Sequence, residues 1–224
     1  MPGVDDGPTS RDQALALLRA AAADDTRVVV ATPHVSRRWP TSPETIEAGV
    51  AALDGSGVTL LAGAEVTHEM ALQLPDEVLR RLTLGSSSCL LLETPLEPVV
   101  GPDFERAFES LLERGYRVLL AHPERSPAMR DNPARLRALV AAGAYCSVTA
   151  AALLGGFGDA SRWFGLELLR DGLVHSVDSD AHHATMRPPG LRAGLEAASA
   201  LLPSLDTQRL AEGVPAALLD DLPL

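Results

Sequence analysis

Histidine and carboxylate side chains follow directly after five short apolar runs of this 224-residue chain. They stand in Ala-Thr-Pro-His34, Gly-Ala-Glu65, Glu93-Thr-Pro, Ala-His122-Pro-Glu-Arg125 and Asp178-Ser-Asp180-Ala-His182. If the runs are parallel strands, these side chains meet at one edge, because the carboxyl ends of parallel strands lie together and form the usual ligand site. Imidazole and carboxylate groups gathered there predict a site for several hard or borderline divalent ions. No thiolate belongs to the set, which disfavours a structural zinc site.

Each of these residues has an ordinary explanation when it is taken alone. His34 could cap a turn, and Asp5 and Asp6 in Asp-Asp-Gly-Pro are common turn residues. Ser-Asp180-Ala-His182 is more specific, because alternate residues of an extended segment point the same way and both can face one ion. Coincidence at five strand ends is improbable, so the combination favours a metal site.

The elements that would position these residues alternate between strand and helix. Six nearly all-apolar runs predict strands buried on both faces of a parallel sheet or barrel: Val28–Ala31, Thr59–Ala62, Cys89–Leu92, Arg117–Leu120, Tyr145–Val148 and Leu173–Val177. Helices are expected over Ser10–Ala23, Pro43–Leu53, Asp76–Leu82, Asp103–Arg114, Pro133–Ala142, Ser161–Arg170 and Leu191–Leu201. The strands recur about every 30 residues, the size of a βα unit. With no linker in the sequence, residues 1–224 are expected to form one α/β domain.

Composition narrows the classes of function. The formal charge of −11 argues against nucleic acid as a partner, because the chain could not replace the counterions of a phosphate backbone. No apolar run approaches the ~20 residues that cross a bilayer, and no charged and apolar leader opens the chain, so we expect no membrane span. Cys89 and Cys146 lie within apolar runs, which predicts reduced thiols and a cytoplasmic location.

The motifs also resemble those of a known family. Pro-Gly-Val-Asp5-Asp6-Gly-Pro, Ala-Thr-Pro-His34, Gly-Ala-Glu65, Ala-His122-Pro-Glu-Arg125, Ser-Asp180-Ala-His182 and Arg187-Pro-Pro occur in the order typical of the PHP (polymerase and histidinol phosphatase) superfamily. Within it, the sequence is most similar to the bacterial capsular or exopolysaccharide protein-tyrosine phosphatases. The Val-Asp-Asp-Gly-Pro turn and the His-Pro-Glu-Arg motif favour this group over histidinol phosphatases and polymerase-associated domains. The resemblance covers nearly the whole chain, from Pro2 to about Pro189.

The resemblance implies a distorted (β/α)7 barrel of the TIM-like kind, with two or three divalent ions at the carboxyl ends of its strands. Manganese is the ion expected, although zinc, iron or cobalt suit the same ligands. By motif, three ligand sets are implied, of which the last two share Glu65: Asp6, His34 and His182; Glu65, Glu93 and His122; and Glu65 with Asp180. The resemblance also assigns Arg125 and Arg187 to the phosphate of the substrate.

The implied activity is hydrolysis of a phosphomonoester, with protein phosphotyrosine as the family's characteristic substrate. Clustered divalent ions lower the pKa of bound water and provide hydroxide near neutral pH. The planar groups of Arg125 and Arg187 favour phosphate over a neutral amide, but they do not separate a monoester from a diester. Neither cysteine lies in a Cys-x5-Arg loop, so a phosphocysteine mechanism is not expected. By resemblance, the partner is a tyrosine kinase of polysaccharide export, or else the substrate is a small phosphomonoester.

The chain departs from the family at its start. Family members have a first strand ending in His-x-His, three residues before Pro-Gly-Val-Asp-Asp-Gly, and here those positions would precede Met1. The ion shared by Glu65 and Asp180 would then lack two imidazole ligands. One interpretation is a native start upstream of Met1. The alternative is a barrel that lacks its first strand and binds phosphate or a partner with weak catalysis or none.

Overall fold

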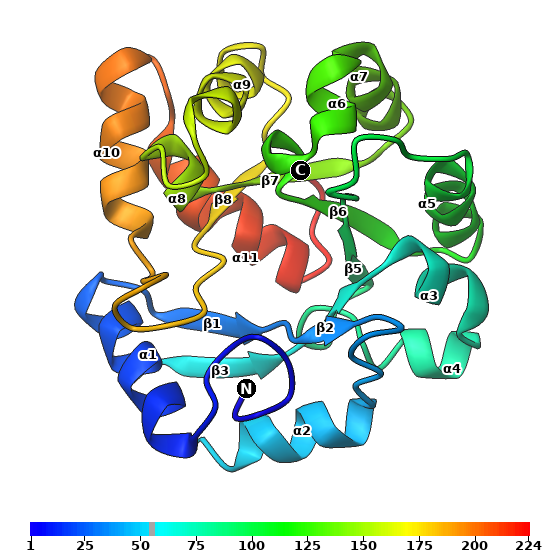
Figure 1. The fold of residues 1–224 in the computed structure, drawn as a ribbon, viewed down its shortest axis with the longest axis vertical. Coiled ribbons are helices and arrows are strands. Elements are labelled where there is room, and N and C mark those ends of the chain that lie inside the picture. Colours follow the sequence, from blue (N-terminus) through cyan, green and yellow to red (C-terminus); the bar gives the residue numbers. More distant parts are fainter. Residues whose placement is uncertain (54–56) are drawn as a thin grey trace.

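Parallel strands form the centre of the computed structural model, which describes residues 1–53 and 57–224 (Figure 1). The strands are β1 Val28–Ala31, β2 His34–Val35, β3 Thr59–Ala62, β4 Glu65–Val66, β5 Cys89–Glu93, β6 Arg117–Ala121, β7 Tyr145–Thr149 and β8 Ser176–Asp178. β1 pairs with β3, and the others pair in the order β2-β4-β5-β6-β7-β8, with every pair parallel. Most of the helices lie outside the strands (Figure 1). This is the α/β architecture that the sequence predicts.

β1 and β2 are two halves of one bent strand, and so are β3 and β4. Val28 pairs with Thr59 across the first halves, and His34 pairs with Glu65 across the second halves, with the same offset along the sequence. The bend falls at Pro33, whose carbonyl oxygen still accepts the N–H of Glu65 at 3.1 Å. The sequence predicts strands that end before the bend. The second halves continue past it and carry the expected ligands His34 and Glu65.

The helices agree with most of the predicted ranges. The longer ones are α1 Arg11–Ala23, α2 Pro43–Ala51, α5 Asp103–Glu113, α7 Pro133–Ala141, α9 Asp159–Arg170 and α10 Leu191–Leu201. The shorter ones are α3 His68–Gln73, α4 Asp76–Leu79, α6 Pro127–Asp131, α8 Ala150–Leu153, α11 Val214–Leu219 and the single turns η1 Pro123–Arg125 and η2 Arg209–Gly213. Ser10 and Ser42 cap α1 and α2, because each hydroxyl accepts the N–H three residues further on. None of the helices described here is long and apolar enough to cross a bilayer.

The last strand, β8, begins later than the sequence predicts. Leu173 and Val174, expected to open the strand, precede it. Leu173 still belongs to the turn that ends α9, because its N–H donates to the carbonyl oxygen of Leu168 at 3.0 Å. Pairing with β7 starts only when the N–H of His175 reaches the carbonyl oxygen of Cys146 at 2.9 Å. The strand is therefore short and ends at Asp178, one residue beyond the expected end.

β1 and β3 are partly exposed, so the expectation that every strand is buried on both faces is wrong for these two. Val28 at the start of β1 is 46% exposed. In the part of the chain that is described, β1 pairs only with β3 and β8 only with β7, so no strand lies between β1 and β8. A cavity of about 910 Å³ lies there instead, and its wall includes Val30 and Val177 as well as His34 and His182. The strands thus form a barrel that is open on one side.

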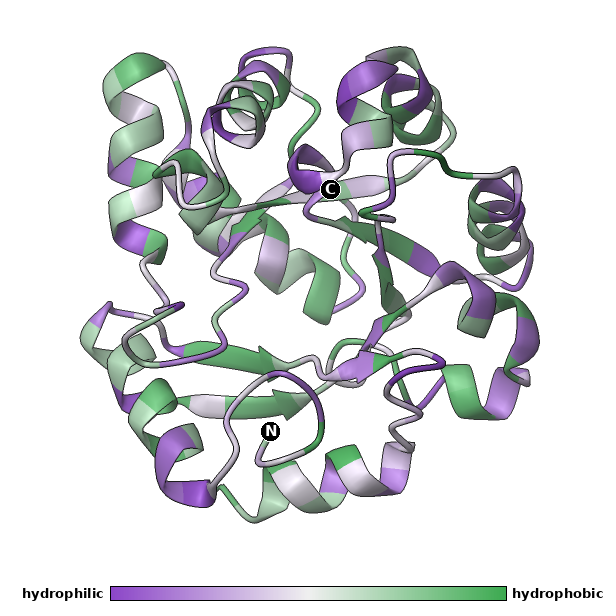
Figure 2. Ribbon diagram, in the orientation of Figure 1, coloured by the Kyte–Doolittle hydropathy of each residue, from purple (hydrophilic) through white to green (hydrophobic). Residues whose placement is uncertain are grey.

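The core lies between the strands and the helices around them. Figure 2 shows hydrophobic residues along the strands and hydrophilic residues mainly on the loops and outer helices. Phe104 and Phe108 of α5 are at most 1% exposed and belong to the same buried cluster as Leu120 of β6. On another side of the strands, Leu218 of α11 packs with Cys89 of β5. This packing fixes the strands, and with them the positions of their carboxyl ends.

Candidate metal and phosphate site

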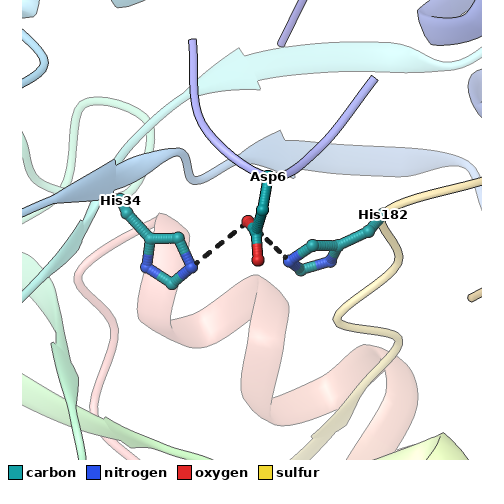
Figure 3. Close-up of side chains that lie close together, drawn as sticks. All are labelled: Asp6, His34 and His182. Carbon is teal, nitrogen blue, oxygen red and sulfur yellow. Dashed lines mark ion pairs between the residues drawn. The ribbon is translucent and has the colours of Figure 1, made fainter. Parts of the chain in front are cut away.

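The loop before α1 brings two adjacent aspartates to the start of β2. Asp5 Oδ1 accepts the N–H of Gly7 at 3.0 Å, and Asp5 Oδ2 accepts the N–H of His34 at 3.0 Å. The second bond ties the loop to the first residue of β2. It leaves Asp6 facing His34 and His182 (Figure 3).

Asp6, His34 and His182 form the first cluster of possible metal ligands, although they come from three distant segments. Asp6 Oδ1 lies 3.6 Å from His34 Nε2 and 3.2 Å from His182 Nε2 (Figure 3). Each residue offers one ligand atom within 4.8 Å of the others. The structure therefore brings together the three residues that the family resemblance assigns to one ion.

Contacts with residues outside the first cluster orient its two imidazoles. His182 Nδ1 lies 3.0 Å from the carbonyl oxygen of Asp180, which leaves its Nε2 for Asp6. The His34 ring stacks on Trp39, with 5.1 Å between ring centres and 16° between planes. Burial and the positive charge of Arg187 lower the pKa of His182. His182 is therefore favoured in its neutral form, which is the form that binds metal.

Glu65 and Glu93 form a second cluster with His34. Glu65 is the first residue of β4, is 5% exposed, and has its Oε2 3.6 Å from His34 Nδ1. Glu93 is the last residue of β5. Burial and the negative charge of Glu65 raise the pKa of Glu93 to about 6. Two partly desolvated carboxylates whose oxygens lie within 4.8 Å of each other favour a cation between them.

His122 contacts the second cluster through Glu65. Its Nε2 lies 2.8 Å from Glu65 Oε1, and both side chains are buried. Burial alone would lower the pKa of His122 and raise that of Glu65, but their attraction and hydrogen bond reverse both shifts. The family resemblance groups His122 with Glu65 and Glu93. The structure places His122 beside Glu65, while His34 completes the cluster.

The two clusters have the donor chemistry of a divalent metal centre. Imidazole nitrogens and carboxylate oxygens suit manganese, zinc, iron and cobalt. His122 Nδ1 is buried and has no hydrogen-bond partner among the described residues, which is costly unless another ligand satisfies it. His34 faces the first cluster through Nε2 and the second through Nδ1. A neutral imidazole has one free lone pair, so His34 can serve only one of the two ions at a time.

Arg125 and Arg187 converge on Asp180. Arg125 Nη1 donates to Asp180 Oδ2 at 2.6 Å, and Arg187 Nη2 donates to the same oxygen. Arg187 Nε is buried without an acceptor in the described part of the chain. Two guanidinium groups with unused donors, next to a candidate metal centre, form a suitable site for a phosphate dianion.

Two of these residues have left-handed backbone conformations that non-glycine residues rarely adopt. The φ angle is 39° at His122 and 45° at Asp180. Arg130 stabilises the turn after His122, because its Nη1 donates to the carbonyl oxygens of Glu124 at 3.0 Å and Arg125 at 2.8 Å. Strained backbone of this kind is concentrated at functional sites, where the surrounding structure holds it in place.

Comparisons with known proteins show the family of this chain. A family model described as capsular polysaccharide synthesis, CpsB/CapC, matches residues 1–219. The chain belongs to the CpsB/CapC family. CapC of Staphylococcus aureus is 31% identical over 193 residues, which are 83% of this chain and 75% of that protein. The tyrosine-protein phosphatase YwqE of Bacillus subtilis is 30% identical over 195 residues, 84% of this chain and 76% of that protein.

A solved structure supports the same assignment. It is one of the crystal structures of YwqE from Bacillus subtilis and CpsB from Streptococcus pneumoniae, two proteins that are described as metal-dependent tyrosine phosphatases. The match covers 100% of this chain and 92% of that chain, with a TM-score of 0.87 and 27% sequence identity. The resemblance to capsular polysaccharide phosphatases and the fold that it implies are therefore confirmed.

Three acidic residues of this CpsB/CapC-family site make contacts that the sequence does not reveal. The carboxylate of Asp5 holds the backbone of His34, as described above. Glu124 Oε1 accepts the N–H of Thr149 at 3.0 Å, and burial raises the pKa of Glu124 to about 7. Asp178 accepts a hydrogen bond from the Ser147 hydroxyl, and burial together with the charge of Asp180 raises its pKa to about 7. Each contact joins segments far apart in the sequence, so the motifs and the strand end in which Asp5, Glu124 and Asp178 stand give no sign of these partners.

The two cysteines of this CpsB/CapC-family chain are buried, as the sequence predicts. Burial raises the pKa of Cys89 to about 12 and also raises the pKa of Cys146. A thiol that stays protonated is a poor nucleophile, so the structure offers no support for a phosphocysteine mechanism.

Proposed function

We propose that this chain is a metal-dependent protein-tyrosine phosphatase that uses metal-activated water. One observation carries the proposal. Arg125 and Arg187 both donate to the carboxylate of Asp180, which precedes His182 of the first candidate metal cluster by two positions in the sequence. YwqE and CpsB are described as tyrosine phosphatases, which favours catalysis over a function limited to binding.

We assign the metal ligands as the motifs imply, to two or three ions that are manganese by preference. The assigned sets are Asp6, His34 and His182; Glu65, Glu93 and His122; and Glu65 with Asp180. The proximity of the first three residues and the burial of Glu65 support this assignment. When bound, such ions supply a water molecule of lowered pKa and offset the charge of the phosphate.

We assign Arg125 and Arg187 to the phosphate group. Both now donate to one carboxylate oxygen, and a phosphate dianion offers more acceptor oxygens and more negative charge to the same donors. Arg187 Nε is a further donor that Asp180 does not use. These contacts would orient the phosphorus atom and stabilise the charge that develops as the ester bond breaks.

We further propose that the substrate is phosphotyrosine of a protein, and that the partner is a tyrosine kinase of polysaccharide export inside the cell. The family description, capsular polysaccharide synthesis, supports this assignment. The charge of −11 disfavours a nucleic acid substrate. We treat residues 1–224 as one domain, because α11 packs against the same strands as the elements before it.

We also propose that one more parallel strand, ending in His-x-His and encoded upstream of Met1, fills the cavity between β1 and β8. The unpaired edges of these strands border the cavity, and an inserted strand could bond to both. The genomic DNA before Met1 tests this idea, because it must contain an in-frame His-x-His shortly upstream. An extended chain should bind one ion more and hydrolyse substrate faster, whereas equal metal content and activity would contradict the proposal.

Release of phosphate from a phosphotyrosine peptide, with added manganese, tests the proposed activity. We expect turnover, and we expect Arg187→Lys to lower kcat/KM about 100-fold, because the loss of one charge-stabilising donor costs that much or more. Arg37→Lys, at an exposed position before α2, is the matched control and should leave the rate unchanged. A folded chain without turnover on manganese, zinc, iron or cobalt would contradict the proposal and favour a binding function.

A further inference from the structure

We propose that Phe157 is a positioning residue that holds Arg125 and Arg187 together as a phosphate-binding pair. The inference rests on the proposed function only in taking these arginines to bind phosphate. The Cζ atom of Arg125 lies over the Phe157 ring, 4.2 Å from its centre, and the Cζ atom of Arg187 lies 5.3 Å from the same centre. One aromatic ring therefore contacts both guanidinium groups.

The two arginines need a partner other than Asp180. Within the described residues, Asp180 is the only carboxylate at ion-pair distance from either arginine. Asp180 is also an assigned metal ligand, and a substrate phosphate competes with it for the guanidinium donors. The ring of Phe157 faces no such competition, because it attracts the guanidinium groups without using their N–H donors. Phe157 can therefore keep the pair in place while the N–H edges turn to phosphate.

The loop between α8 and α9 presents Phe157 in a tightly folded backbone. The N–H of Gly156 donates to the carbonyl oxygen of Ala151 at 2.8 Å, and the N–H of Gly158 donates to that of Gly155 at 3.0 Å. Gly155 and Gly158 have φ angles of 86° and 84°, which glycine adopts at little cost. These bonds place the ring over the arginines without any bound substrate, as a positioning role requires.

Two substitutions separate the aromatic face from the bulk of the side chain. Phe157→Leu keeps an apolar side chain but removes the face, whereas Phe157→Tyr keeps the face. Binding of inorganic phosphate to the metal-loaded chain is measured by calorimetry, with metal content and melting temperature as checks on folding. We expect F157L to bind phosphate about tenfold more weakly and F157Y to bind within about twofold of the wild type, since two cation–π contacts are lost in the first only. The KM for a phosphotyrosine peptide should rise in F157L by a similar factor.

Trp163→Leu is the matched control. Trp163 is exposed on α9 and lies 5.3 Å from the Cζ atom of Arg162, so it makes the same kind of contact with a different arginine. It should not change phosphate affinity. Wild-type affinity in F157L, or an equal loss in F157L and F157Y, would overturn the proposal. Because phosphate binding is measured without turnover, a tenfold loss in F157L supports the proposal even in a chain that hydrolyses no peptide.

Discussion

Asp5 and Asp6 are adjacent in the sequence, but their carboxylates make different contacts. Asp5 bonds to two backbone N–H groups, and Asp6 faces the imidazoles of His34 and His182. At the residue scale, we predict that Asp6→Asn weakens binding of one metal ion at least about tenfold and leaves the melting temperature of the metal-free chain unchanged. Elemental analysis after dialysis measures the bound metal, and thermal unfolding measures the melting temperature. Asp12→Asn, exposed on α1, is the control, and full metal content in Asp6→Asn would show that the assignment is wrong.

Residues in motifs were the predictable part of the site. Asp6, His34 and His182 come together as the strand-end pattern and the family resemblance imply. The contacts of Phe157 could not be predicted, because a phenylalanine between glycines carries no spacing that points to arginines 32 residues before it and 30 residues after it. Local patterns reveal which residue types end a strand. They do not reveal which side chains from other segments meet them.

At the element scale, the bends between β1 and β2 and between β3 and β4 limited the prediction of where these strands end. Pro33 and Gly63 interrupt the apolar runs, so the sequence predicts strand ends at Ala31 and Ala62. Pairing nevertheless resumes beyond both residues, because each strand sets the register of its neighbour. A side chain at Gly63 would approach the Val30 side chain to 2.8 Å, so the close packing of the two paths requires glycine there.

Packing between α8 and α10 also depends on one glycine. A Cβ atom on Gly194 would lie 2.8 Å from both the Cα atom and the carbonyl oxygen of Ala150, which cannot move without shifting α8. We predict that Gly194→Ala lowers the free energy of unfolding by about 1–3 kcal/mol, although alanine favours a helix more than glycine does. Urea unfolding measures the change. Gly101→Ala, where a Cβ meets nothing within 4 Å, should be close to neutral. An unchanged free energy of unfolding in Gly194→Ala would contradict the close packing of α8 on α10.

At the scale of the whole molecule, we predict that the metal-free chain loses stability as the pH rises from 7 to 9. Burial opposes protonation of His122, but Glu65 raises its pKa from 6.5 to about 9. The folded state therefore binds this proton more tightly than the unfolded state. The stabilisation is fully present below pH 6.5 and is lost as the pH rises through 9.

Urea unfolding of the metal-free chain at pH 7 and pH 9 measures this loss. The His122→Gln variant should show a smaller decrease between the two pH values, because it has no imidazole to titrate. If His122→Gln lost as much stability between pH 7 and pH 9 as the wild type, the pair of His122 and Glu65 would not be the cause of the loss.

Metal dependence of phosphotyrosine hydrolysis tests the central claim most directly. Chain freed of metal by chelation is titrated with manganese, and phosphate release from a phosphotyrosine peptide is measured together with bound manganese in the same samples. The account predicts no turnover without metal, and activity that rises with bound manganese until two or three ions are bound per chain. Turnover in the metal-free chain, or its absence at full manganese occupancy, would contradict the account.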